Sequence, residues 1–399
     1  MRRSILLLMF AFVANSVWGQ NFVTTWATAE QLTEPHNLPP DPGLSGNSLR
    51  QIVQVSIGGK ALRLRLSNEF SDEAVEIEGI EIATALSAGE SSDVDDGTTT
   101  PLLFGGSRSV KIAAGGTVAS DVVKFRLNPR QNVAITIHYG QCSNKVVTGH
   151  PGSRTTSYLA SGNTSDFAGA VETNHWCTIN AIDVVAGKKA NAIAILGNSI
   201  TDGRGSTTNQ QDRWPDQMSR ELLKHKATKN TAVLNFGIGG NCVVRGGLGQ
   251  PAAKRYMRDL FGQQGVKYII LFEGTNDLGG SKDGAKTAEE VVGVFKEIIG
   301  EARSRGIKVY GATITPAGKS FYDKESHRTG RALINRWIRT EADLDGVIDF
   351  DRLVQDPDDP EAMQSRFLYE NDWLHLNAIG YEEMGRFAAE NFVVYEHAD

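Results

Sequence analysis

Along the first half of the chain, hydrophobic positions alternate with polar ones, which is the period of strands that bury one face. Residues 51–57 and 61–66 alternate in this way on either side of Gly58-Gly59, a pattern that predicts a β-hairpin. Similar runs follow at residues 75–85, 122–127 and 133–139. Short strands separated by polar, glycine-rich turns are typical of a sandwich or jelly-roll. We therefore expect residues 20–189 to form an all-β domain.

The second half has a different pattern, in which short apolar runs alternate with segments of helical periodicity. The run at 192–196 is wholly apolar, as in a parallel strand covered on both faces, and further strands are expected at 232–236, 268–272, 308–314 and 346–350. Helices are expected near 214–225, 291–302, 328–339 and 378–391. This alternation predicts a doubly wound, flavodoxin-like α/β domain over residues 190–399, which binds its ligands beyond the carboxyl ends of the strands.

The first residues have the character of a signal peptide. Arg2-Arg3 gives them a positive charge, and the apolar stretch at 5–13 is too short to span a bilayer. Val17-Trp18-Gly19 offers a cleavage site, so residues 1–19 are expected to be removed during export to the periplasm or the medium. An N-terminal anchor that is retained is the alternative. No later stretch approaches about 18 apolar residues, so we expect no membrane insertion after processing.

The composition narrows the range of partners. With 41 basic and 47 acidic side chains the net charge is −6, whereas nucleic acid and anionic lipid both require a basic surface. Three cysteines are too few for a disulfide framework. Cys142 and Cys177 either pair or stay free, and Cys242 is expected to be buried. No metal-ligand spacing is present, and we expect neither a metal nor an organic cofactor.

Residues suited to acyl transfer follow three of the predicted strands. Ser199 comes just after the first strand, where a hydroxyl can face solvent among backbone N–H groups. The glycine-rich turn 237–240 follows the second and lets backbone N–H groups point toward a ligand. The amide of Asn276 follows the third and can donate to a developing oxyanion. Taken singly, each has a simpler explanation as a helix cap, a phosphate-binding turn or a turn residue.

Near the end of the chain, an aspartate precedes a histidine by three residues. Of the eight histidines, His375 has Asp372 at this offset, within the predicted α/β domain. The similar pair of Glu172 and His175 lies in the β-rich half. A carboxylate that accepts from one imidazole nitrogen leaves the other nitrogen free to take a serine proton. A surface hydrogen bond is the simpler explanation of a single such pair.

Taken together and in this order, the four segments resemble the sequence blocks of the SGNH, or GDSL-type, serine hydrolases. The resemblance implies that Ser199 is the nucleophile, that His375 is the general base and that Asp372 orients the imidazole. It also implies an oxyanion hole made by the backbone N–H groups of Ser199 and Gly240 and by the Asn276 amide.

The resemblance covers residues 190–393 and departs from the family pattern at two positions. Asn198 stands where the family usually has aspartate, and Leu376 stands where proline commonly follows the histidine. Neither residue transfers a proton, so the implied activity is not in doubt. The β-rich half is similar to that of a secreted subgroup of these proteins in the segments 25–28, 49–51, 65–68 and 149–152. Three roles are possible for this β-rich half: it binds glycan, it forms one side of the active site, or it only stabilises the fold.

The reaction that the resemblance implies is hydrolysis of a small-molecule or polysaccharide ester through an acyl-enzyme. The loops 245–251 and 279–286 do not form the apolar trough that a lipase for long chains needs. Together with export, the acidic charge and the added β domain, this favours a secreted carbohydrate acetyl esterase that deacetylates a polysaccharide. A broad short-chain or aryl esterase, or a lipase, is the alternative. A third hypothesis, of another class, is an inactive glycan-binding protein.

Overall fold

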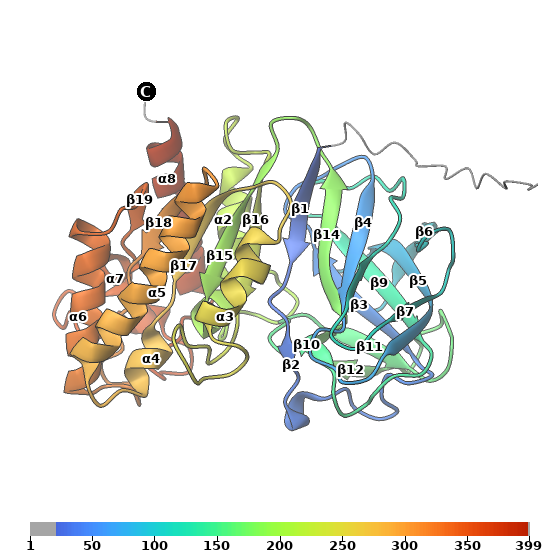
Figure 1. The fold of residues 1–399 in the computed structure, drawn as a ribbon, viewed down its shortest axis with the longest axis horizontal. Coiled ribbons are helices and arrows are strands. Elements are labelled where there is room, and N and C mark those ends of the chain that lie inside the picture. The colour runs from blue at the N-terminus through green and yellow to red at the C-terminus, as the bar shows by residue number, and fades with distance from the viewer. Residues whose placement is uncertain (1–20, 398–399) are drawn as a thin grey trace, which may run out of the picture.

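The computed structural model describes residues 21–397, in which antiparallel sheets precede a parallel α/β sheet (Figure 1). We call residues 21–190 the β half and residues 191–397 the α/β half. The expected signal peptide, residues 1–19, lies outside the described part of the chain. Within residues 21–397, no helix combines the length and the apolar character that crossing a bilayer requires.

The β half contains three antiparallel sheets. The first has the order β1-β14-β4-β8, with the bounds Phe22–Ala27, Ile179–Val185, Leu62–Ser67 and Thr117–Ala119. A small sheet has the order β13-β10-β2, with the bounds Trp176–Cys177, Thr148–His150 and Gln31–Leu32. A 3-10 helix at Pro35–Asn37 follows β2 along the chain. The largest has the order β12-β11-β3-β9-β5-β6, with β7 also paired to β5; the bounds are Val171–Thr173, Ser157–Ala160, Ser48–Gln54, Asn132–Tyr139, Val75–Ala85, Val94–Pro101 and, for β7, Val110–Ile112.

Alternate side chains of the two larger sheets meet in one hydrophobic core, as in a β-sandwich. Strands β4 and β9 show this clearly, because every second residue is fully buried in that core: Leu62, Leu64, Leu66, Val133, Ile135 and Ile137. The prediction of an all-β region is therefore confirmed.

The hairpin predicted around Gly58-Gly59 is wrong, because β3 and β4 belong to different sheets. β3 pairs with β9 and β11, whereas β4 pairs with β14 and β8. The two glycines allow close packing instead: a Cβ at Gly58 would collide with the carbonyl of Leu127, and one at Gly59 would crowd β14. The strand predicted at 122–127 is reduced to two isolated bridges. Alternation identifies the buried face of a strand but not its partner strand.

The α/β half is a five-stranded parallel sheet with the strand order of flavodoxin-like folds, flanked by helices (Figure 1). The order β16-β15-β17-β18-β19 runs through Thr231–Gly237, Asn191–Gly197, Val266–Phe272, Lys308–Ala312 and Gly346–Ile348. The α-helices α1 to α8 are Ser199–Asp202, Trp214–Leu222, Ala252–Tyr256, Thr275–Gly279, Gly284–Ser304, Glu325–Thr340, Phe350–Val354 and Ala378–His397. A π-helical segment, Met257–Phe261, follows α3, and a 3-10 helix, Ser365–Phe367, precedes α8.

The predicted fold class of this half is confirmed, and the differences lie at element ends. The strand expected at 346–350 ends at Ile348, because Asp349 caps α7 by accepting from a backbone N–H of the next turn. The strand expected at 308–314 ends at Ala312, and the helix expected to reach residue 225 ends at Leu222.

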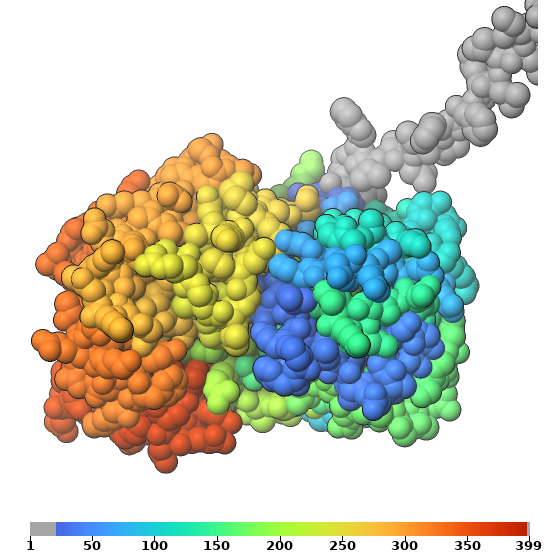
Figure 2. Space-filling view, turned by 60° about the horizontal axis from the view of Figure 1, so that its bottom comes forward, coloured from blue at the N-terminus to red at the C-terminus, as the bar shows by residue number. Residues whose placement is uncertain are grey.

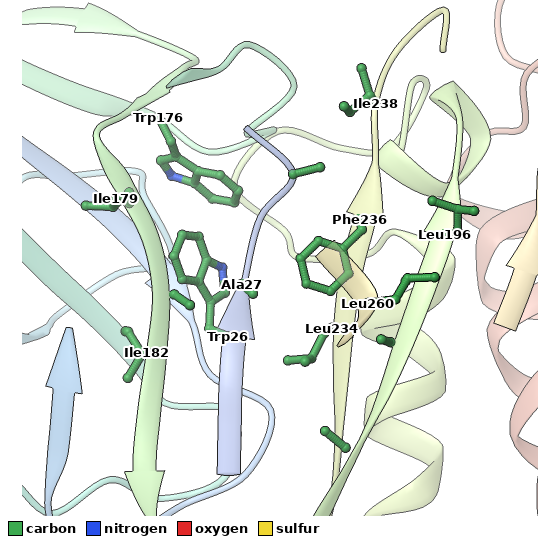
Figure 3. Close-up of a cluster of buried hydrophobic side chains, with 14 of the residues drawn as sticks. Trp26, Ala27, Trp176, Ile179, Ile182, Leu196, Leu234, Phe236, Ile238 and Leu260 are labelled. Atoms are coloured by element: carbon green, nitrogen blue, oxygen red, sulfur yellow. The ribbon is translucent and has the colours of Figure 1, made fainter. Parts of the chain in front are cut away.

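The two halves pack against each other along β1 and β16, which are both edge strands. Ser56 Oγ donates to the carbonyl of Val233 at 2.8 Å and accepts from its N–H at 3.2 Å, so it covers part of the β16 edge. Beside this contact, Trp26 and Trp176 of the β half and Phe236 of the α/β half lie in one hydrophobic core (Figure 3). The halves therefore share buried apolar surface.

The three cysteines are all free thiols. Cys142 and Cys177 do not form a disulfide, and Cys242 is buried, as expected. Burial raises the pKa of Cys142 to about 11 and that of Cys177 to about 12, so neither thiol ionises near neutral pH.

Candidate functional site

Ser199 is the first residue of α1, directly after the tight turn that follows β15. β15 ends at Gly197, and Asn198 caps the helix by accepting from the N–H of Ile200 at 3.1 Å. A Cβ at Gly197 would collide with the Thr201 hydroxyl, so the turn requires glycine. Ser199 is thereby held at the carboxyl end of β15 with 8% of its surface exposed.

The structure brings Ser199, His375 and Asp372 together, although the serine and the histidine are 176 residues apart. Ser199 Oγ lies 2.8 Å from His375 Nε2, and His375 Nδ1 lies 2.6 Å from Asp372 Oδ2. The second oxygen of Asp372 accepts from the backbone N–H groups of Leu374 at 2.9 Å and His375 at 2.8 Å. This loop geometry fixes the carboxylate against one edge of the imidazole.

The protonation states in this chain of hydrogen bonds follow from the environment of Asp372. Partial burial favours the neutral acid, but hydrogen bonds from the ring and backbone of His375 and from the N–H of Leu374 outweigh it, so the pKa of Asp372 lies below its usual value. An ionised carboxylate can only accept, and therefore Nδ1 of His375 carries the proton. In the neutral imidazole Nε2 is then an acceptor, positioned to receive the proton of Ser199.

Three groups are the candidate donors of the oxyanion hole. Within residues 21–397, the backbone N–H groups of Ser199 and Gly240 find no acceptor. Asn276 donates one amide hydrogen to the carbonyl of Asn241 at 2.7 Å, and its Oδ1 accepts from the Tyr322 hydroxyl at 3.0 Å. These two contacts fix the plane of the amide and leave its second hydrogen free.

Strand adjacency places these donors near the serine, although no direct hydrogen bond joins Gly240 or Asn276 to Ser199 among the described residues. At the end of β15, Gly197 lies between Gly237 of β16 and Phe272 of β17. Gly240 and Asn276 line one open cavity of about 600 Å³, which we call the oxyanion cavity.

A buried arginine, Arg255, bonds to the carboxyl ends of β15 and β16. No motif in the sequence indicates this role. Arg255 is fully buried, and its side chain is fully paired with the following groups: the carbonyls of Gly197 and Phe236, Asn241 Oδ1, and the carboxylate of Asp259. Arg255 thus ties the ends of β15 and β16 to the loop that follows Gly240. Nearby, burial raises the pKa of Glu273 to about 8, although Arg255 lies 3.6 Å away and opposes the shift.

The β half also reaches the helix that carries Ser199. Asp202, at the end of α1, is buried, and it accepts from His150 Nε2 and from Arg154 Nη2, each at 2.9 Å. The charge of Arg154 and the hydrogen bond from His150 outweigh the effect of burial and lower the pKa of Asp202. His150 Nδ1 lies 2.7 Å from the carbonyl oxygen of Ala29, so both ring nitrogens are within hydrogen-bond distance of an oxygen. The segment 149–152 is similar to the secreted subgroup but carries no sequence signal for the contact between His150 and Asp202.

The comparisons with known proteins bear on the α/β half. A model of the GDSL-like Lipase/Acylhydrolase family matches residues 195–383. No curated protein matches the chain. Among solved structures, a GDSL-like lipase from Bacteroides thetaiotaomicron is 19% identical, with 54% of this chain and 92% of that chain covered and a TM-score of 0.39.

Two carbohydrate esterases are also similar at a low level. A carbohydrate acetylesterase family member from Sinorhizobium meliloti is 15% identical, with 51% of this chain and 98% of that chain covered and a TM-score of 0.40. A family two carbohydrate esterase from Clostridium thermocellum, solved in complex with cellohexaose, is 13% identical, with 94% and 98% covered and a TM-score of 0.41. Similarity at this level carries no information on the substrate of this chain.

Proposed function

Since the C-terminal half of this chain, over residues 195–383, belongs to the GDSL-like lipase/acylhydrolase family, we propose that the protein is a serine ester hydrolase with Ser199 as its nucleophile. The observation that carries the proposal is the chain of hydrogen bonds from Ser199 through His375 to Asp372. Nucleophilic catalysis by serine needs a base within hydrogen-bond reach and a third group that orients this base. These groups lie beyond the carboxyl ends of a doubly wound sheet, where such folds bind ligands.

In the first step, the Ser199 oxygen attacks the ester carbonyl carbon while Nε2 of His375 takes the hydroxyl proton. The ionised Asp372 stabilises the imidazolium that forms. Negative charge develops on the carbonyl oxygen, which accepts from the N–H groups of Ser199 and Gly240 and from the free amide hydrogen of Asn276.

In the second step, the imidazolium of His375 gives its proton to the leaving alkoxide, and the alcohol departs. Water then attacks the acyl-enzyme while Nε2 takes a proton from it, and this proton returns to Ser199 as the acid leaves. The described groups supply every proton transfer in this cycle.

We propose further that the substrate is an acetylated polysaccharide. The oxyanion cavity is lined by charged side chains, among them Arg245, Lys282, Lys286 and Glu290. A long acyl chain requires an apolar wall, because burying charged groups against it without partners is costly. A short acyl group leaves these side chains hydrated. This supports an acetyl esterase over a lipase.

The test compares acyl length with acetate release. Activity on p-nitrophenyl esters from acetate to decanoate should be highest at acetate, and acetylated plant polysaccharides should release acetate in the same assay series. A preference for chains longer than about eight carbons would contradict the acetyl-esterase proposal and favour a lipase. Activity on aryl acetates without any release from polysaccharides would favour the broad short-chain esterase.

The proposal includes export through removal of residues 1–19. The N-terminus of the protein recovered from the periplasm or the medium of the producing cell should be Gln20. A chain that retains Met1 in the membrane fraction would contradict it.

A further inference from the structure

We propose that a cleft between the two halves binds the alcohol portion of the ester, a saccharide, and that Arg204 and Asn174 determine specificity there. The inference rests on the proposed function and adds to it where the saccharide lies. The cleft has a volume of about 360 Å³ and is lined by residues of both halves. We call it the interhalf cleft. It opens along the seam between the N-terminal residues and those near residue 250 (Figure 2).

Residues close in sequence to the candidate catalytic groups line the interhalf cleft. Asp202, on the helix that begins at Ser199, lines it, and so does Gly239, which precedes Gly240. From the β half, His150 and Arg154 line the same space. The cleft therefore lies against the helix that begins at the nucleophile, and neither half can form it alone.

The position of the leaving alcohol favours this cleft, and not the oxyanion cavity, as the saccharide site. The carbonyl oxygen must point to Gly240 and Asn276, whereas the leaving oxygen must face His375, which protonates it. A Cβ at Gly205 would collide with the carbonyl of Leu376, so the segment that carries Arg204 packs directly against the residue that follows His375. Arg204 lines the interhalf cleft, which therefore lies on the histidine side of the serine.

The floor of the cleft is rigid before any ligand binds. Asp202 is 2% exposed and is held by His150 and Arg154. A Cβ at Gly152 would collide with the Asp202 carboxylate, so the loop of the β half lies in direct contact with it. A preformed surface avoids the entropic cost of ordering loops when the ligand arrives.

The walls of the cleft offer hydrogen-bonding groups that the described residues do not use. The Arg204 guanidinium, the Asn174 amide nitrogen and the Thr208 hydroxyl make no hydrogen bond within residues 21–397. All three residues are exposed. A hydroxyl-rich ring can replace the water on these groups with equivalent hydrogen bonds, whereas an alkyl or aryl alcohol cannot. The geometry therefore favours a saccharide as the alcohol.

The experiment compares two esters that share the acetyl group, p-nitrophenyl acetate and an acetylated xylo-oligosaccharide. The measured quantity is the ratio of kcat/KM on the oligosaccharide to kcat/KM on the aryl ester. Combining Arg204→Ala with Asn174→Ala should lower this ratio about 10-fold or more, because hydrogen bonds to the sugar alone are lost. Arg108→Ala, which removes an exposed arginine between β6 and β7, is the matched control and should leave the ratio unchanged.

The outcomes separate this inference from the proposed function. If Ser199→Ala keeps its ester turnover, the proposed function fails. If Ser199→Ala abolishes turnover but the cleft variant keeps the wild-type ratio, the cleft assignment alone is overturned. If Lys282→Ala lowers the ratio and the cleft variant does not, the saccharide lies in the oxyanion cavity. This result would also overturn the cleft assignment. Turnover of the aryl ester with none of the oligosaccharide would overturn the saccharide as the alcohol.

Discussion

The two halves of the molecule contribute to the candidate site in different ways. The α/β half supplies every group placed in the reaction: Ser199, Gly240 and Asn276 after successive parallel strands, and Asp372 and His375 in the loop before α8. The β half supplies none of these groups, yet it holds the end of the nucleophile's helix through His150 and Arg154, which both bond to the buried carboxylate of Asp202. The reacting groups thus belong to one half, and part of their positioning belongs to the other.

This difference predicts two kinds of variant. The reacting groups lie at the carboxyl edge of the sheet, where a smaller side chain leaves the cores of both halves intact, so their loss should affect activity and barely affect stability. The contacts between the halves are buried, so their loss should affect both. The following variants test this distinction in order of decreasing effect.

Ser199→Ala should lower ester turnover by about 10⁴-fold or more, because no other group in the site can form the acyl-enzyme. Among residues 21–397 its hydroxyl hydrogen-bonds only to His375, so the midpoint of thermal unfolding should shift by less than about 2 °C. Both are measured on the same preparation, by hydrolysis of p-nitrophenyl acetate and by calorimetry. Turnover within 10-fold of the wild type would remove the serine from this role.

Asn276→Ala should lower kcat by about 10² to 10³-fold with little change in KM, because the amide stabilises charge that exists only in the transition state. Steady-state kinetics on p-nitrophenyl acetate measures both constants. An effect confined to KM would show that the amide binds substrate and does not stabilise the oxyanion.

His150→Ala should lower the free energy of unfolding by about 2 kcal/mol, because Asp202 stays buried with only Arg154 as its partner. It should also lower kcat, since α1 loses one of its two anchors to the β half. Urea unfolding and steady-state kinetics test the two effects, with the exposed His225→Ala as the control. A loss of stability without any change in kcat would show that the β half does not position the nucleophile.

Tyr322→Phe should lower kcat about 5-fold to 10-fold with KM unchanged, because the Asn276 amide loses one of the two contacts that fix its plane. Tyr395→Phe removes a hydroxyl that donates to the carbonyl of Val347 in β19, the edge strand far from β16, and it should leave kcat unchanged. Equal effects of the two substitutions would contradict a positioning role for Tyr322.

A separate effect concerns the pH dependence of stability. Burial raises the pKa of Glu273 from 4.5 to about 8, so the folded chain keeps a proton that the unfolded chain loses near pH 4.5. The free energy of unfolding therefore falls, through this group, as the pH rises from about 4.5 to about 8. Glu273→Gln should remove this contribution, which urea unfolding at several pH values within the window measures.

The β half offers a matched case for this titration. Burial also raises the pKa of Glu30 to about 8, so Glu30→Gln should weaken the same pH dependence without touching the candidate site. A pH dependence that is unchanged in both variants would contradict the assignment of buried, protonated carboxyl groups.

The sequence allowed the α/β half to be predicted in more detail than the β half, for a physical reason. A parallel sheet joined by right-handed crossovers has few possible strand orders, so the five apolar runs led to the observed order. In the β half, alternation identified β5 and β9 closely, but the pairing of β3 and β4 depends on long-range packing, and the predicted hairpin failed.

The candidate site divides in a similar way. Ser199, His375 and Asp372 belong to short motifs at predicted strand ends and loops, so their types and spacing could be interpreted from the sequence. Arg255 and Tyr322 act through contacts with residues that no motif connects to them, and local patterns do not encode such contacts.

The central claim, that Ser199 is a nucleophile activated by His375, has a direct measurement. The protein is incubated with a fluorophosphonate, which phosphonylates activated serines, and the modified peptide is identified by mass spectrometry. The account predicts one adduct per chain, located on Ser199, and no adduct in His375→Ala. An adduct on another residue, or an active enzyme that takes up no label, would contradict it.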